Sequence, residues 1–188
     1  MTDSTGAKSG DMALDAIVPA GYASWQLNDK FWLGLGVNAP FGLGTMVPST
    51  WSTNGQYYNR TSQLQTANVN PTVAYKITDD LSVGFGVQVQ RTYVRMNNAT
   101  VTTVPSLAPT MTSELRGFDP LSVGFTAGVT YKVLKSTEVG FGYRSKMTPG
   151  LNGDAYTYTV SNGAIYDDKS IRAKITMPDT FSAGIRPE

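Results

Sequence analysis

The sequence contains neither cysteine nor histidine. The absence of cysteine excludes disulfides and thiol chemistry, and the absence of histidine removes the commonest metal ligand. Charged residues amount to only 15%, against roughly 25% in ordinary soluble domains. The formal net charge of +1 gives no reason to expect nucleic acid as a partner. We therefore expect no metal and no cofactor. No His, Cys or Gly-x-Ser-x-Gly constellation is present either, so we do not expect an enzyme.

Long hydrophobic runs are missing as well. No apolar stretch approaches the roughly 20 residues that a membrane helix needs. The N-terminal MTDSTGAKSGDMALD also lacks the apolar centre of a signal peptide. Two interpretations follow: the protein is cytosolic, or its natural N-terminus lies outside this sequence.

What the sequence does contain is alternation of apolar and polar residues. LSVGFGVQVQ, which begins at Leu81, places Leu, Val, Phe, Val and Val on one face and Ser, Gly and Gln on the other. LSVGFTAGVTYKV, from Leu121, repeats the pattern. Such a period of two predicts strands. We predict about seven strands, at residues 15–27, 31–43, 62–77, 81–98, 120–134, 137–149 and 169–186.

The connections between these strands alternate in length. Tight turns are expected at residues 27–30, 78–81 and 134–137, and long polar segments at 44–61, 99–119 and 150–168. In an up-and-down sheet all short turns then lie at one end, as in outer-membrane barrels. The five apolar positions from Leu81 to Val89 form a band about 20–25 Å tall. We therefore predict an all-β fold, an antiparallel up-and-down transmembrane β-barrel.

A soluble β-sandwich would show the same alternation. The strands are long for a sandwich, and their polar faces are rich in Gly, Ser, Thr and Gln rather than charged. Bacterial single-chain barrels have an even number of strands, and an open sheet leaves exposed edges. We therefore expect a fragment of a barrel, truncated at both ends.

Several ordered stretches resemble the FadL-like family of outer-membrane transporters for long-chain fatty acids and aromatic hydrocarbons. They are VPAGYASWQLNDKFWLGLGVNAPFGLGT, LQTANVNPTVAYKITDDLSVGFGVQVQ, GFTAGVTYKV, VGFGYRSKM and ITMPDTFSAGIR. The resemblance implies a fourteen-stranded barrel closed by an N-terminal hatch. Residues 1–188 then form a partial barrel domain that matches the second to eighth strands, without the hatch, the first strand and the last strands.

The resemblance also implies function and location. We expect passive transport of a hydrophobic small molecule across the bacterial outer membrane, with outer-membrane lipid and lipopolysaccharide as surroundings, and a monomer. The signal peptide is expected to be missing from this fragment. A fatty acid and an aromatic hydrocarbon both remain open as the ligand. The alternative function is a general water-filled porin or a structural outer-membrane barrel.

The segment NAPFG interrupts the second predicted strand at Asn38, Ala39, Pro40, Phe41 and Gly42. Pro40 removes a ladder donor, and Asn38 and Gly42 tolerate unusual backbone shapes. The resemblance implies an inward bend here that leaves a lateral opening for ligand release. The simpler interpretation is a bulge that ends the strand before its loop.

Two further candidate sites come from charge and hydrophobicity. If the apolar face meets lipid, then Arg144, Lys146, Arg172 and Lys174 point into the lumen, where they suit a carboxylate head group. Alternatively, they pair with acidic groups elsewhere or face lipopolysaccharide. One loop is unusually apolar for an external loop, and the resemblance implies that this loop and the next one form an external docking groove. Alternatively, the same side chains pack among themselves. The groove residues are Val104, Leu107, Met111, Leu115, Tyr156 and Tyr158.

Overall fold

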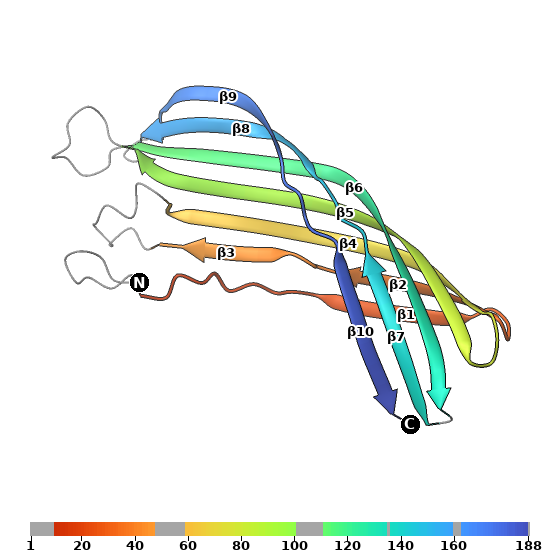
Figure 1. Ribbon diagram of the computed structural model, residues 1–188. Coiled ribbons are helices and arrows are strands. Elements are labelled where there is room, and N and C mark those ends of the chain that lie inside the picture. Colours follow the sequence, from red (N-terminus) through yellow and green to blue (C-terminus); the bar gives the residue numbers. More distant parts are fainter. Residues whose placement is uncertain (1–9, 48–58, 101–110, 135, 160–162, 188) are drawn as a thin grey trace.

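The computed structural model describes residues 10–47, 59–100, 111–134, 136–159 and 163–187. These residues form one open antiparallel sheet, as Figure 1 shows. Its strands are β1 (Ala20–Gln26), β2 (Phe31–Asn38), β3 (Gly42–Met46), β4 (Thr61–Lys76), β5 (Leu81–Thr100), β6 (Met111–Leu134), β7 (Thr137–Arg144), β8 (Gly150–Thr159), β9 (Ile165–Lys174) and β10 (Thr180–Pro187). None of the described residues forms a helix that is long and apolar enough to cross a membrane.

The ten strands make seven passages of the chain across the sheet. β2 and β3 both pair with β4, and β7 and β8 both pair with β6. In the last passage β9 pairs with β8 and β10 with β7. The seven predicted strands are thus the seven passages, three of which are interrupted. The predicted all-β antiparallel fold is confirmed.

The predicted strand bounds were wrong at the loop end of the sheet. Residues 111–119, 150–159 and 165–168 were assigned to long loops, yet they belong to β6, β8 and β9. These segments are rich in Thr, Ser, Asp and Tyr, so they show no clear apolar alternation. They are strands because each finds a hydrogen-bonded neighbour, which is a tertiary effect. The first strand also differs, since it begins at Ala20 rather than at residue 15.

The tight turns gather at one end of the sheet, as the alternation of connections predicts (Figure 1). In the first turn Asn28 Oδ1 accepts hydrogen bonds from the amides of Lys30 and Phe31, at 2.9 and 3.0 Å. In the second turn the Lys76 ammonium lies 2.6 Å from the Asp79 carboxylate. That hydrogen bond lowers the pKa of Asp79 below its ordinary value. We call this end the turn end and the opposite one the loop end.

The uninterrupted strand β5 defines two faces of the sheet. Its odd-numbered residues from Leu81 to Val89 are apolar, and residues opposite each other in neighbouring strands share a face. Val69 and Val123 lie opposite Val89 and extend this outer face. The even-numbered residues of β5 mark the inner face.

Burial on the two faces is the reverse of that in a water-soluble protein. Phe85 on the outer face is 50% exposed, whereas Gln88 and Gln90 on the inner face are 0% and 1% exposed. All described strands belong to one sheet, so no second sheet covers the outer face. A soluble sandwich would bury that face, and a barrel wall presents it to lipid.

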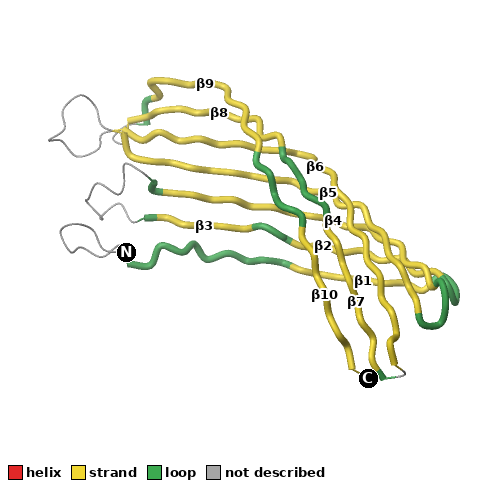
Figure 2. Tube along the Cα trace, in the orientation of Figure 1, coloured by secondary structure: helices red, strands yellow, loops and turns green. Residues whose placement is uncertain are grey.

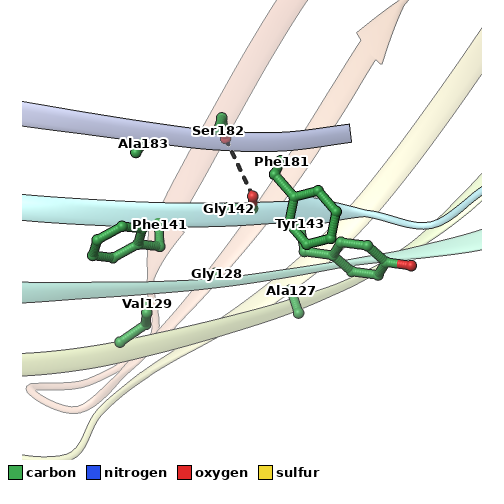
Figure 3. Close-up of a pocket in the computed structure, with 9 residues that line it drawn as sticks. All are labelled: Ala127, Gly128, Val129, Phe141, Gly142, Tyr143, Phe181, Ser182 and Ala183. Carbon is green, nitrogen blue, oxygen red and sulfur yellow. Dashed lines mark hydrogen bonds between the residues drawn. The ribbon is translucent and has the colours of Figure 1, made fainter. Parts of the chain in front are cut away.

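Aromatic rings form a ladder across the outer face. Phe85, Phe125, Tyr143 and Phe181 follow one another across β5, β6, β7 and β10, with ring centroids 6.1, 5.6 and 5.0 Å apart. Beside them lies a hollow of about 590 Å³, shown in Figure 3. Gly128 and Gly142 lie between its apolar side chains, and the Ser182 hydroxyl donates to the Gly142 carbonyl at 3.4 Å. The hollow opens on the outer face, so it belongs to the lipid-facing wall.

Two irregularities reverse which residues of a strand lie on the inner and outer faces. One is in β6 and the other follows β7, and both lie between the turn end and the loop end. In β6 the register against β5 shifts by one residue between Gln90 and Thr92, so that Pro120 and Leu121 lie opposite Arg91 alone. In the sixth passage, which contains β7 and β8, the chain bends after Arg144, where Ser145 exchanges two hydrogen bonds with the Phe125 backbone, at 2.8 and 2.9 Å. A shift of one residue moves every following side chain to the other face.

Candidate ligand path

The interruption of the second passage lies at the residues where the sequence predicts it. β2 ends at Asn38, which pairs with Asn68, and β3 begins at Gly42, which pairs with Gln65. Four steps along this passage thus correspond to three along β4, so one residue is inserted. The amide of Phe41 donates to the Thr66 hydroxyl at 3.0 Å, and that hydroxyl donates back to the Phe41 carbonyl at 2.6 Å.

We expect Thr66→Val to destabilise the folded protein by about 1–2 kcal/mol, because both hydrogen bonds to Phe41 are lost at a buried position. The measurement is the free energy of unfolding in urea in a detergent that permits reversible folding. Thr66→Ser keeps the hydroxyl and serves as the control. Equal stability of the Val variant and the wild type would mean that the bulge does not depend on this side chain.

On its other side, the same passage separates from the chain that precedes β1. Ala20 pairs with Asn38, and Ala13 pairs with Thr45. The Leu14 amide also donates to the Gly44 carbonyl at 3.0 Å. Between these points the structure records no ladder hydrogen bond from residues 15–19 to 39–43, although all of them are described. We call these two segments, which are not paired with each other, the window. Figure 2 shows residues 15–19 and the connection between β2 and β3 as loop.

The window has the same register at both of its ends. The pairs Ala20–Asn38 and Ala13–Thr45 are seven residues apart on each chain, so the two chains separate and rejoin without slipping. Pro19 and Pro40 each lack a backbone donor. Ile17 and Val18 are 96% and 64% exposed. In a hydrocarbon environment, unpaired backbone persists only where protein or water satisfies it.

A row of amide side chains begins at the edge of the window on the inner face. The register places Asn38 opposite Asn68, and Asn68 opposite Gln90. Gln88 lies one position further along the inner face. The Arg144 guanidinium reaches across from β7 and donates to Asn68 Oδ1 at 3.5 Å. We call Asn38, Asn68, Gln88, Gln90 and Arg144 the amide cluster.

The amide cluster is buried but only partly hydrogen-bonded. Gln88 Nε2 donates to the Phe125 carbonyl at 3.0 Å, and Gln90 Nε2 contacts Met177 Sδ at 3.0 Å. Four buried polar atoms of the cluster have no partner among the described residues: Asn38 Oδ1, Asn68 Nδ2, Gln88 Oε1 and Gln90 Oε1. Buried polar atoms are normally paired, so these atoms are available to a polar ligand group or to water.

On the loop-end side of the amide cluster, several buried side chains of the inner face are apolar. Val94, Met147, Leu151 and Met177 are each at most 4% exposed. A hollow of about 640 Å³ lies further toward the loop end. Met96, Leu115 and Ala155 are among its lining residues, together with Asp167 and Lys169, which form a salt bridge. The four buried residues thus form an apolar lining beside the amide cluster, whereas the hollow beyond them has a mixed polar and apolar lining.

The same exchange corrects the predicted patch of four inner cations. Arg144 lies on the inner face because it pairs with Thr126, opposite Gly86 of β5. Arg172, in contrast, pairs with Asn152, which lies opposite Phe118 and through it Tyr93 on the outer face.

Lys174 follows Arg172 by two residues in β9 and shares the outer face. Lys146 is exposed between the buried Ser145 and Met147, whose side chains fill the inner-face space at Gly124. Lys146 therefore points to the outer face. The four cations do not form one inner patch, because alternation counted along each strand ignores the bends. Head-group binding by Arg144 stays a prediction.

The predicted docking groove is not assembled as one surface either. Val104 and Leu107 lie outside the described residues. Met111 and Leu115 lie on the inner face, whereas Tyr156 pairs with Glu114 on the outer face and Tyr158 with Thr112. Sequence reasoning also missed the amide cluster as a site. The sequence predicts roles for Asn38, at the break, and for Arg144, among the inner cations, but for Asn68, Gln88 and Gln90 it predicts only a position on a polar face. Nothing in one strand's pattern shows which strands its side chains will meet.

A single antiparallel sheet with an apolar exposed face and buried amides on the other defines a segment of an outer-membrane β-barrel wall. The chain belongs to the family of outer membrane protein transport proteins (OMPP1/FadL/TodX), whose sequence model matches residues 1–187. This membership places the protein in the bacterial outer membrane. The family consists of transport proteins and not of enzymes.

Curated relatives and solved structures agree with this assignment. The chain is 26% identical over 189 residues to outer membrane protein P1 of Haemophilus influenzae, covering 87% of this chain and 40% of the relative. It is 25% identical over 159 residues to a long-chain fatty acid transport protein of Salmonella typhi, covering 77% and 36%. The chain thus spans about 40% of the length of the first of these relatives.

The fold is that of two proteins of known structure. A Pseudomonas aeruginosa FadL homologue matches with a TM-score of 0.80 and 21% identity, over 96% of this chain and 47% of that one. The Ralstonia pickettii toluene transporter TbuX matches with a TM-score of 0.64 and 19% identity, over 87% and 49%.

Proposed function

We propose that the protein takes part in passive uptake of a hydrophobic molecule through the outer membrane, with lateral release through the window. The observation that carries the proposal is the order of features along the inner face. An apolar lining at the loop end meets the amide cluster, and the amide cluster ends at segments 15–19 and 39–43, which are not paired with each other. A molecule with an apolar body would leave water for that lining and pass sideways into lipid.

Two groups of the amide cluster, the Arg144 guanidinium and the Asn68 amide nitrogen, favour a ligand with a carboxylate over a bare hydrocarbon. Arg144 supplies a cation on the inner face, and Asn68 Nδ2 is an unpaired donor beside it. A carboxylate accepts hydrogen bonds from both kinds of group. A long-chain fatty acid fits this arrangement, with its tail on the apolar lining. The long-chain fatty acid transport protein among the relatives is consistent with such a ligand.

Closing the window chemically tests the proposal. The register places Ile17 opposite Phe41, so Ile17→Cys with Phe41→Cys puts two thiols across the gap in a chain that has no cysteine of its own. A short reversible bis-thiol reagent should lower fatty-acid uptake about tenfold or more, as a closed gate does, and reduction should restore it.

The matched control is Ala23→Cys with Leu35→Cys, a pair that lies opposite each other in the ladder of β1 and β2. Cross-linking there should leave uptake unchanged. Undiminished uptake through a cross-linked window would reject lateral release. Rapid passage of small sugars into liposomes, with no preference for hydrophobic molecules, would favour the alternative of a water-filled porin.

A further inference from the structure

Cations gather on the outer face directly beyond the apolar band. In β5, Arg91 follows Val89, the last residue of the apolar run, by two positions on the same face. Lys174 pairs with Gly150. The pairing of β6 with β8 ends at Phe118 and Asn152, and two more steps in the same register place Gly150 level with Pro120, at the bulge opposite Arg91. Arg172 and Lys146 also lie on the outer face at the loop end. We call Arg91, Lys146, Arg172 and Lys174 the basic belt.

The basic belt is neither paired nor neutralised. All four residues are exposed, and none of the salt bridges among the described residues involves them. The next row on the outer face holds Gln65, Tyr93, Phe118, Asn152 and Arg172, without a carboxylate. One row further, Arg95 and Arg116 both bind Glu114, so those charges are largely compensated.

The turn end of the outer face has a different composition. Trp25, Phe31, Tyr75 and Tyr131 lie there, and Phe31 and Tyr75 are in contact with their ring centroids 4.7 Å apart. The strand lysines at that end, Lys76 and Lys132, pair with Ser82 and Glu138 on the inner face. One border of the apolar band is thus aromatic and uncharged on the outer face, whereas the other combines aromatics with unpaired cations.

We propose that the basic belt binds the phosphate groups of lipid A-type head groups in the leaflet at the loop end. Arginine and lysine are the residues that recognise phosphate, and basic groups beside an apolar surface bind anionic lipid. Lys174 and Arg91 lie three strand spacings apart, or about 14 Å, so the belt suits a head group with more than one phosphate. Tyr93 and Phe118 supply the interfacial aromatic contact beside the cations.

The test uses the complete protein in detergent micelles, with lipid binding measured by native mass spectrometry. The variant is Arg91→Gln with Arg172→Gln and Lys174→Gln. We expect it to lose about 100-fold in affinity for bisphosphorylated lipid A. Each of the three cations contributes a similar share of the electrostatic attraction to the anionic head group, and the three shares are lost together. The control replaces three lysines of the turn end, Lys30→Gln with Lys76→Gln and Lys132→Gln, and should keep wild-type affinity.

Three outcomes would overturn the proposal: equal wild-type affinity for lipid A with and without its phosphates, equal affinity for phosphatidylglycerol, or full affinity in the triple variant. Correct folding of each variant is checked by its migration on gels before heating. Fatty-acid uptake should be unchanged in the triple variant. Lost uptake with retained lipid A binding would place these cations on the ligand path instead.

The lipid A measurement is independent of the proposed function. If cross-linking the window does not reduce uptake, lateral release is rejected, but the result on lipid A binding still stands.

Discussion

Deletion of Pro19 together with Pro40 should reduce uptake of the hydrophobic ligand to below about a tenth of the wild-type rate, because it lets the window pair as a continuous ladder. Removing Pro40 takes out the one residue inserted between Asn38 and Gly42, so two residues then face Thr66 and Ala67 of β4. Removing Pro19 shortens the facing segment equally. The register on both sides is thereby kept, and the two residues without a backbone donor are gone.

The matched control for the double deletion is Pro40→Ala. It restores a backbone donor but keeps the inserted residue, so the bulge and the uptake should both remain. The measurement is uptake of a labelled fatty acid by cells that carry equal amounts of folded protein in the outer membrane. Wild-type uptake by the double deletion, with a crystal structure that shows a closed ladder, would mean that ligand leaves by another route.

The second prediction concerns Arg144. Arg144→Ala should weaken fatty-acid binding about 10- to 100-fold, since a charge-assisted hydrogen bond to a carboxylate is lost on the inner face. Arg144→Lys keeps the charge but not the bidentate geometry, so we expect an intermediate loss. Binding of the corresponding fatty alcohol should change much less, because it lacks the carboxylate. Binding is measured with a fluorescent fatty acid in detergent solution.

Arg172→Ala is the matched control for Arg144→Ala. Both residues were expected on the inner face from the sequence, yet Arg172 lies on the outer face. Its replacement should leave fatty-acid binding unchanged. If the two variants lose affinity equally, the exchange of faces beyond Arg144 does not persist in the membrane. If neither loses affinity, the head group binds elsewhere.

The sequence was most informative where a strand is regular. Residues 81–90 predict both the strand and its two faces, because a period of two is a local consequence of the pleat. The tight turns were predicted for the same reason, since Asn28 and Thr78 act on their own neighbours in the chain. The interruption at Pro40 could also be located from the sequence, since proline limits the backbone wherever it stands.

The loop end could not be derived in this way. One residue is inserted at Pro120–Leu121, and the chain bends after Arg144. As a result, the residues of β8 and β9 lie on the opposite faces from those that alternation continued from β7 and β10 would give. The local pattern does not reveal this, because Ile171 and Ala173 look lipid-facing by hydrophobicity alone. They pair instead with Gly153 and Leu151, on the inner face. Only the pairing of strands distant in sequence decides between the two orientations.

The amino-acid sequence by itself thus determined the seven passages of the chain, the order of turns and loops, and the position of the break at NAPFG. Each of these follows from residues that are neighbours in the chain. The tertiary structure decided which side chains share a face. It joined Asn38, Asn68, Gln90 and Arg144 into one cluster beside the window, and it moved Lys146, Arg172 and Lys174 to the outer face. The physical reason is that cross-strand register depends on single-residue bulges, and their effect on the faces passes from one strand to the next.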